Sequence, residues 1–128
     1  MPIQYLGSWQ PLEPLLVAHM LGTAEVGSGD KFLDLGCGDG QFLERAELMG
    51  AQASGIEIDP DLVAICQGKG LNVIQGDVFD ADVSKKSVVS FWFTDEVQVP
   101  LLMDKLYAEM KNGARLVYVY HLKIEWKA

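Results

Sequence analysis

The feature that most constrains this chain is a repeated change of hydrophobic periodicity, from short apolar runs to stretches with helical spacing. Short apolar runs bounded by turn residues are typical of buried strands, whereas apolar residues three and four positions apart are typical of helices. Strands that alternate with helices indicate a parallel sheet joined by crossover helices. The predicted helices cover residues 11–24, 41–49, 60–69 and 100–110, and the predicted strands cover residues 31–35, 53–57, 72–75, 87–93 and 114–124.

Turn residues support the boundaries of these elements. Gly50 and Gly70 follow the second and third predicted helices, where glycine commonly ends a helix. Asp59 and Pro60 suit the cap and the first position of the third helix. The chain has 128 residues, 49% of them hydrophobic, and no repeat or linker interrupts the alternation. The sequence therefore predicts one doubly wound α/β domain over residues 1–128.

Charge and composition exclude several classes of partner. The chain has 18 acidic and 10 basic residues and a net charge of -8, whereas nucleic-acid binding depends on clustered lysine and arginine. A cationic partner is easier to accommodate, although acidity also serves solubility alone. The two cysteines, Cys37 and Cys66, have no metal-ligand spacing, so no metal site is expected. Without a signal peptide or an apolar run of about 20 residues, a cytoplasmic location without membrane insertion is expected.

A glycine cluster follows the first predicted strand. Its members are Gly36, Gly38 and Gly40, with Asp34 before the first glycine and Asp39 before the last. In a doubly wound sheet, ligands bind beyond the carboxyl ends of the strands, where this loop lies. Glycine lets the backbone approach a ligand, and the next helix offers unpaired N–H groups.

Glu57 ends the next predicted strand, where a carboxylate can accept hydrogen bonds from both hydroxyls of a ribose. A ribose-binding acid is compatible with NAD and with S-adenosylmethionine. The dinucleotide fingerprint requires glycine where this chain has Gln41, and two aspartates beside the loop would repel a pyrophosphate. S-adenosylmethionine instead presents an ammonium and a sulfonium group, so the loop favours it, and an NAD-binding domain is the remote alternative.

A third acid, Asp77, follows the third predicted strand. Its side chain could hydrogen-bond the exocyclic amine of an adenine, with Ile58 and Val78 covering the faces of the ring. Taken alone, such an acid is equally well a solvated strand end. No nucleophilic role is expected for Cys37, because nothing near it in sequence would lower the pKa of its thiol.

With these residues in place, the chain resembles the class I S-adenosylmethionine-dependent methyltransferases. The first motif of that class is matched by Asp34-Leu35-Gly36-Cys37-Gly38-Asp39-Gly40, and the second by Gly55-Ile56-Glu57-Ile58-Asp59-Pro60. Within the class, it is most similar to the small protein lysine methyltransferases, through Trp9-Gln10-Pro11, Val88-Val89-Ser90-Phe91 and Phe93-Thr94. The resemblance implies a Rossmann-like, mostly parallel sheet in the order 3-2-1-4-5, without the last two strands usual in the family.

The resemblance also implies the residues of the site. The expected cofactor-binding residues are Asp34, Leu35, Gly36, Cys37, Gly38, Gly40, Glu57, Ile58, Asp77, Val78 and Phe91. A lysine-bearing protein is the implied substrate, and aromatic walls could hold its cationic amine. The expected substrate-binding residues are Trp9, Trp92, Phe93 and Thr94. Methyl transfer requires alignment more than a general base, so no catalytic residue is assigned.

The end of the chain leads to a prediction about assembly. In the order 3-2-1-4-5, the fifth strand would lie at an open edge, and such an edge pairs readily with another chain. A homodimer across strand five, or by exchange of C-terminal segments, is therefore expected, with Trp126 buried in the contact. A binding module without catalysis, a small-molecule methyltransferase and a half that needs a partner chain remain alternatives.

Overall fold

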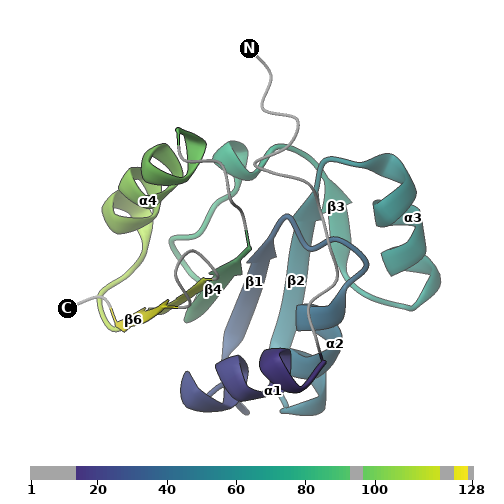
Figure 1. The fold of residues 1–128 in the computed structure, drawn as a ribbon, viewed down its shortest axis with the longest axis horizontal. Helices are drawn as coiled ribbons and strands as arrows, with labels where there is room; N and C mark the ends of the chain where they lie inside the picture. The colour runs from purple at the N-terminus through teal and green to yellow at the C-terminus, as the bar shows by residue number, and fades with distance from the viewer. Residues whose placement is uncertain (1–13, 93–96, 119–122, 127–128) are drawn as a thin grey trace.

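The computed structural model describes residues 14–92, 97–118 and 123–126, the last segment by its backbone. Its centre is a six-stranded sheet in the order β3-β2-β1-β4-β5-β6 (Figure 1). The strands are β1 (Lys31–Leu35), β2 (Gln52–Glu57), β3 (Val73–Gln75), β4 (Val88–Phe91), β5 (Arg115–Tyr118) and β6 (Lys123–Trp126). The helices are α1 (Pro14–Thr23), α2 (Gln41–Leu48), α3 (Pro60–Gly68), the short 3-10 helix η1 (Val78–Asp80) and α4 (Gln98–Glu109).

The first five strands are parallel and lie in the predicted order 3-2-1-4-5. The predicted cap of α3 is confirmed, because the Asp59 carboxylate accepts the N–H of Asp61 and Pro60 occupies the first turn. The helices of the described residues do not have the length and hydrophobicity that a membrane span requires.

The prediction of one long fifth strand over residues 114–124 is wrong. The chain forms two strands there, and β6 pairs antiparallel with β5, with Arg115 opposite Trp126 and Tyr118 opposite Lys123. The fifth strand is therefore not an open edge, and one strand beyond the expected five is present. The alternation Lys123-Ile124-Glu125-Trp126 is typical of a separate strand with one polar face, and it is the signal that would have shown this.

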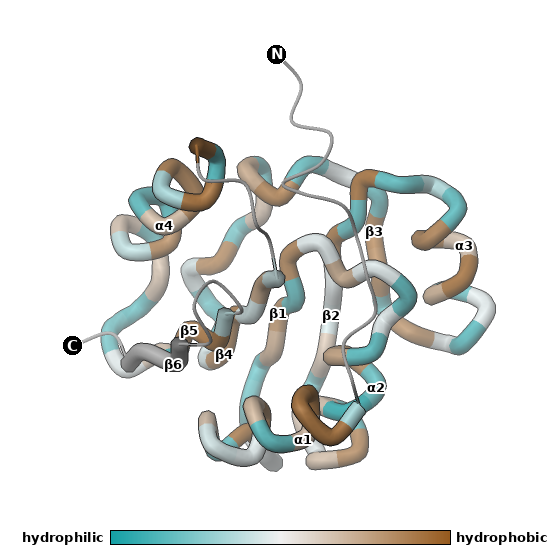
Figure 2. Tube along the Cα trace, in the orientation of Figure 1, coloured by the Kyte–Doolittle hydropathy of each residue, from teal (hydrophilic) through white to brown (hydrophobic). Residues whose placement is uncertain are grey.

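Two apolar clusters cover the two faces of the sheet. Phe32, Val88 and Val117 pack in one cluster with residues of α1, α2 and α3. Leu33, Leu35, Val89, Phe91, Leu116 and Tyr118 pack in the other with residues of α4. Successive residues of a strand point to opposite faces, so the alternation assigns Asp34 and Ser90 to the face of α1 and α2. Hydrophobic and hydrophilic stretches alternate along α3 and α4, as expected of helices that cover a sheet (Figure 2).

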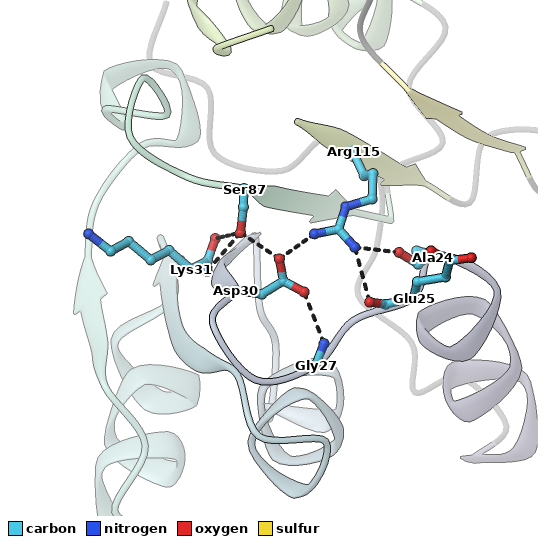
Figure 3. A network of polar contacts seen from close by, with 7 residues as sticks. All are labelled: Ala24, Glu25, Gly27, Asp30, Lys31, Ser87 and Arg115. Atoms are coloured by element: carbon cyan, nitrogen blue, oxygen red, sulfur yellow. Dashed lines mark hydrogen bonds and ion pairs between the residues drawn. The ribbon is translucent and has the colours of Figure 1, made fainter. Parts of the chain in front are cut away.

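A polar network joins the amino ends of β1, β4 and β5 (Figure 3). The Asp30 carboxylate forms an ion pair with Arg115, accepts the hydroxyl of Ser87 at 2.8 Å and accepts the N–H of Gly27 at 2.9 Å. The Arg115 guanidinium also donates to the carbonyl of Ala24 at 2.7 Å. The network lies at the end of the sheet opposite the glycine loop, and it fastens the segment after α1 to the strands.

Replacing Asp30 with asparagine should lower the free energy of unfolding by about 2 kcal/mol, because it leaves a half-buried guanidinium without its counter-charge. The side chains of Asp30 and Arg115 are only 12% and 15% exposed. Glu44→Gln is the matched control, since it removes the acid of an exposed pair with Lys69 and should change stability by less than about 0.5 kcal/mol. Chemical denaturation measures both, and equal losses would contradict the structural role of the network.

Candidate functional site

The loop between β1 and α2 folds back onto the carboxyl end of β2. The N–H groups of Gly36 and Cys37 both donate to the carbonyl of Ile56, at 2.8 and 3.2 Å. The loop ends at Gly40, where φ is +94° and a Cβ atom would lie 2.4 Å from Cδ1 of Leu71. Both the backbone conformation and the lack of space therefore require glycine at this position.

Glu57 holds the loop and the next turn together with one carboxylate. Its Oε1 accepts the N–H of Gly38 at 2.9 Å, and its Oε2 accepts the N–H of Asp59 at 2.9 Å. The side chain is only 5% exposed. Each carboxylate oxygen can accept more than one hydrogen bond, so this fixed carboxylate keeps the capacity to bind a pair of hydroxyl groups.

Asp34 lies beneath the loop as a second buried carboxyl. It accepts the hydroxyl of Ser90 at 2.7 Å, from the position opposite it in the β1–β4 register. Burial raises the pKa of the Asp34 carboxyl from 3.8 to about 8; the hydrogen bond from Ser90 opposes this shift, and the nearby charge of Glu57 adds to it.

Asp39 contributes a further carboxylate oxygen within the loop. Its Oδ1 is buried and has no hydrogen-bond partner within the described part of the chain. The ammonium of Lys69 approaches Asp39 only through the backbone, since it donates to the Asp39 carbonyl at 2.9 Å and pairs with Glu44 at 3.1 Å. An orphan carboxylate oxygen is costly without a donor, so the loop suits a ligand that carries N–H groups or positive charge.

Cys37 belongs to this loop, and Cys66 contacts it from α3. A Cβ atom at Gly55 would lie 2.8 Å from Sγ of Cys37, so this strand glycine makes room for the thiol. The thiol of Cys66 in α3 donates to the carbonyl of Gly38 at 3.2 Å. Burial raises the pKa of both thiols, and nearby negative groups add to the shift at Cys37. Neither cysteine is therefore suited to act as a nucleophile.

Asp77 and its neighbours lie beside the end of β2. The N–H of Gly76 donates to the carbonyl of Glu57 at 3.0 Å, which places the two acids at adjacent strand ends. The Oδ1 of Asp77 accepts the N–H of Phe79 at 2.9 Å and caps η1. Val78 is buried and Ile58 is partly exposed. The loop, Glu57 and Asp77 are thus brought to one edge of the sheet.

The predicted residues at the end of β4 are only partly described. The ring of Phe91 is fully buried and stacks on Tyr118, with ring centroids 5.3 Å apart. The whole residue is 0% exposed, so neither its ring nor its backbone offers surface to a ligand in this structure. Trp92 is partly exposed. Trp9, Phe93 and Thr94 lie outside the described residues.

Three residues of the site were not predicted as binding residues. In the sequence, Ser90 is only part of a predicted strand, Asp39 only a charge of the glycine loop, and Cys66 only a free thiol. Ser90 and Cys66 have partners that are far away in sequence, with 56 positions between Ser90 and Asp34 and 28 between Cys66 and Gly38. For Ser90, the one available signal was a polar residue inside an otherwise apolar strand.

Solved structures assign the class of the protein. An RNA methyltransferase from Salinibacter ruber, in complex with S-adenosyl-L-homocysteine, is 34% identical with a TM-score of 0.79, over 85% of this chain and 76% of that one. A SAM-dependent methyltransferase from Archaeoglobus fulgidus is 26% identical with a TM-score of 0.68, over 83% of this chain and 52% of that one. The fold and the loop define a class I S-adenosylmethionine-dependent methyltransferase.

Sequence comparison narrows the assignment to a family. The model of the family described as methionine biosynthesis protein MetW matches residues 18–103. A protein-lysine N-methyltransferase from Saccharolobus islandicus is 31% identical over 117 residues, which cover 84% of this chain and 72% of that protein. The chain belongs to the MetW family, and its cofactor is S-adenosylmethionine, as predicted.

Proposed function

We propose that this methyltransferase transfers methyl groups to lysine side chains of proteins. The observation that carries the proposal is the 31% identity to a protein-lysine N-methyltransferase, at a coverage of 72% of that protein. The net charge of -8 supports it, because an acidic surface attracts lysine-rich proteins and repels polyanions.

The cofactor would be held by the residues predicted for it. The fixed carboxylate of Glu57 would accept the ribose hydroxyls, and Asp77 would accept the amine of the adenine through its second oxygen. The backbone around Gly36 and Gly38 would face the amino-acid part of the cofactor, near the orphan oxygen of Asp39. The burial of Glu57 and its two backbone donors support this placement, because they fix its carboxylate before any ligand arrives.

The bound cofactor supplies an activated methyl group on a sulfonium, and the chain has to align the acceptor and exclude water. A lysine must first lose a proton, which at pH 7 costs about 5 kcal/mol from a pKa near 10.4. An apolar, water-poor entrance lowers that pKa. Trp92, at the carboxyl end of β4, is partly exposed and is the described aromatic side chain proposed for this entrance.

The test is methyl transfer from a labelled donor to basic model proteins, followed by mass mapping. Label on lysine residues is expected, and the same proteins with their lysines acetylated beforehand should remain unlabelled, because an amide nitrogen does not accept the methyl group. Label confined to small-molecule acceptors would discard the lysine assignment. A chain that binds the donor but labels nothing would act as a binding module or need a partner chain.

RNA is the second candidate acceptor, because the solved structure with 34% identity is described as an RNA methyltransferase. The excess of eight negative charges opposes an RNA acceptor, since RNA binding gains its affinity from basic residues. Transfer RNA in the same labelling assay separates the two candidates. Label on RNA alone would replace lysine by RNA as the acceptor.

Association of two copies remains a prediction, but the strand expected to form the contact changes from the fifth to the sixth. Because β6 covers β5, the free edge at this end of the described sheet belongs to β6, and pairing of two chains would use that strand or an exchange of C-terminal segments. The side chain of Trp126, which is predicted to be buried in the contact, is outside the part of the chain whose side chains are described. Light scattering should give twice the mass of 14.1 kDa, and the mass of one chain at high concentration would contradict the dimer.

A cytoplasmic location is proposed for this protein. Two free, buried thiols suit a reducing compartment.

A further inference from the structure

The buried side chains of the described residues include two carboxyl groups, those of Asp34 and Glu57, and the hydroxyl of Ser90. The cost of burying the Glu57 carboxylate is offset by two backbone N–H groups that donate to it. The cost of burying the Asp34 carboxylate is offset much less. Asp34 receives the hydroxyl of Ser90, and none of the ion pairs among the described residues includes it.

The groups that face Asp34 add no positive charge. Ser90 from β4 is neutral, Glu57 from β2 is acidic, and Cys37 from the loop carries a thiol whose pKa is itself raised by burial. A buried carboxylate without a cation is strongly disfavoured and is neutralised by taking up a proton. The raised pKa of Asp34, about 8, expresses this cost.

We propose that Asp34 selects for a positively charged ligand: its carboxyl binds a proton while no ligand is present and releases that proton when a cationic cofactor is bound beside it. The inference rests on the proposed placement of the cofactor in the glycine loop, which begins two residues after Asp34. The proton passes to the solvent, and the positive charge of the cofactor takes its place beside the carboxylate. Ser90 is then a positioning residue, because its hydroxyl donates to the carboxylate in either state.

The sign of the pH dependence follows from this exchange. Below about pH 8 the free protein must lose a proton on binding, so affinity rises with pH, by about tenfold per unit while the carboxyl of the free protein stays protonated. Above about pH 8 this contribution to affinity levels off. Replacing Asp34 with asparagine removes the titrating group with little change of shape. Any ionisation of the ligand itself contributes equally to both chains, so it drops out of the difference between them.

The experiment is calorimetric titration of S-adenosylmethionine at pH 7 in two buffers with different ionisation enthalpies. The difference in heat gives the number of protons released. The unchanged chain should release close to one proton more than the Asp34→Asn variant. Ser90→Ala should move the rise in affinity to higher pH, because it removes a hydrogen bond that favours the carboxylate.

A second measurement needs no ligand. The carboxyl has a pKa of about 8 in the folded chain against 3.8 when unfolded, so it destabilises the fold increasingly as pH rises through that range. The melting temperature of Asp34→Asn should therefore exceed that of the unchanged chain by a margin that grows from pH 5 to pH 8.

The outcomes separate this inference from the proposed function. Binding with equal proton release by both chains, or a constant stability difference from pH 5 to pH 8, would overturn the role of Asp34 and leave the cofactor placement standing. Absence of binding by the unchanged chain would overturn the cofactor placement and the inference together.

Discussion

Glu57→Gln should weaken binding of S-adenosylmethionine by about 100-fold or more, which corresponds to about 2.7 kcal/mol. The carboxylate accepts the N–H groups of Gly38 and Asp59, each at 2.9 Å, and the proposed ribose hydroxyls in addition. A glutamine has one acceptor oxygen and would direct its NH₂ group at one of these donors. Hydrogen bonds to charged groups contribute about 1.5 to 3 kcal/mol each, so the loss of one accounts for the effect.

Calorimetry measures this change in affinity, and thermal unfolding shows whether the variant still folds. Glu47→Gln is the matched control, because Glu47 is exposed on α2 and should leave the dissociation constant unchanged. A dissociation constant for Glu57→Gln within threefold of the unchanged chain, with folding preserved, would remove Glu57 from the cofactor site.

Gly40→Ala should lower the free energy of unfolding by about 3 kcal/mol. A residue with a side chain in the left-handed conformation costs about 1 to 2 kcal/mol, and overpacking of a core adds about 1 to 3 kcal/mol. Both apply at Gly40, where φ is +94° and the new Cβ would lie 2.4 Å from Cδ1 of Leu71 and 3.3 Å from Sγ of Cys66.

Gly70→Ala separates the two causes. Gly70 has a φ of +79°, but a Cβ there would have no atom within 4 Å, so only the backbone term applies and a loss of about 1 kcal/mol is expected. Chemical denaturation gives both values. Equal losses at the two positions would show that Leu71 moves aside freely and that the loop is not held by contact with the core.

The sequence predicted the part of this structure that depends on local pattern. The strand at Lys31–Leu35 and the cap at Asp59 were found because apolar runs and capping residues act over a few positions. The glycine loop and Glu57 were found because a parallel sheet brings successive strand ends to one edge. Their joint position follows from the topology, so it could be predicted without coordinates.

The rest depends on contacts between distant residues. The ion pair of Asp30 and Arg115 joins residues 85 positions apart, and the hydrogen bond of Ser90 to Asp34 spans 56. Asp30 and Arg115 are each compatible with an exposed strand end, and Ser90 is only a polar residue inside an apolar strand. The division of residues 114–124 into two strands was missed for a similar reason, because the pairing of β6 with β5 decides it. Local pattern cannot assign such partners.

The separation of the Asp30 network from the glycine loop has a practical consequence. The two lie at opposite ends of the same strands, so amino-acid changes around Asp30 and Ser87 can alter resistance to heat without touching the groups that would meet a cofactor. Mutations at distant sites usually add in their effects. Directed evolution toward new acceptors could therefore begin from a variant that is stabilised around the Asp30 network. Such a variant would tolerate the destabilising changes that new specificity tends to require.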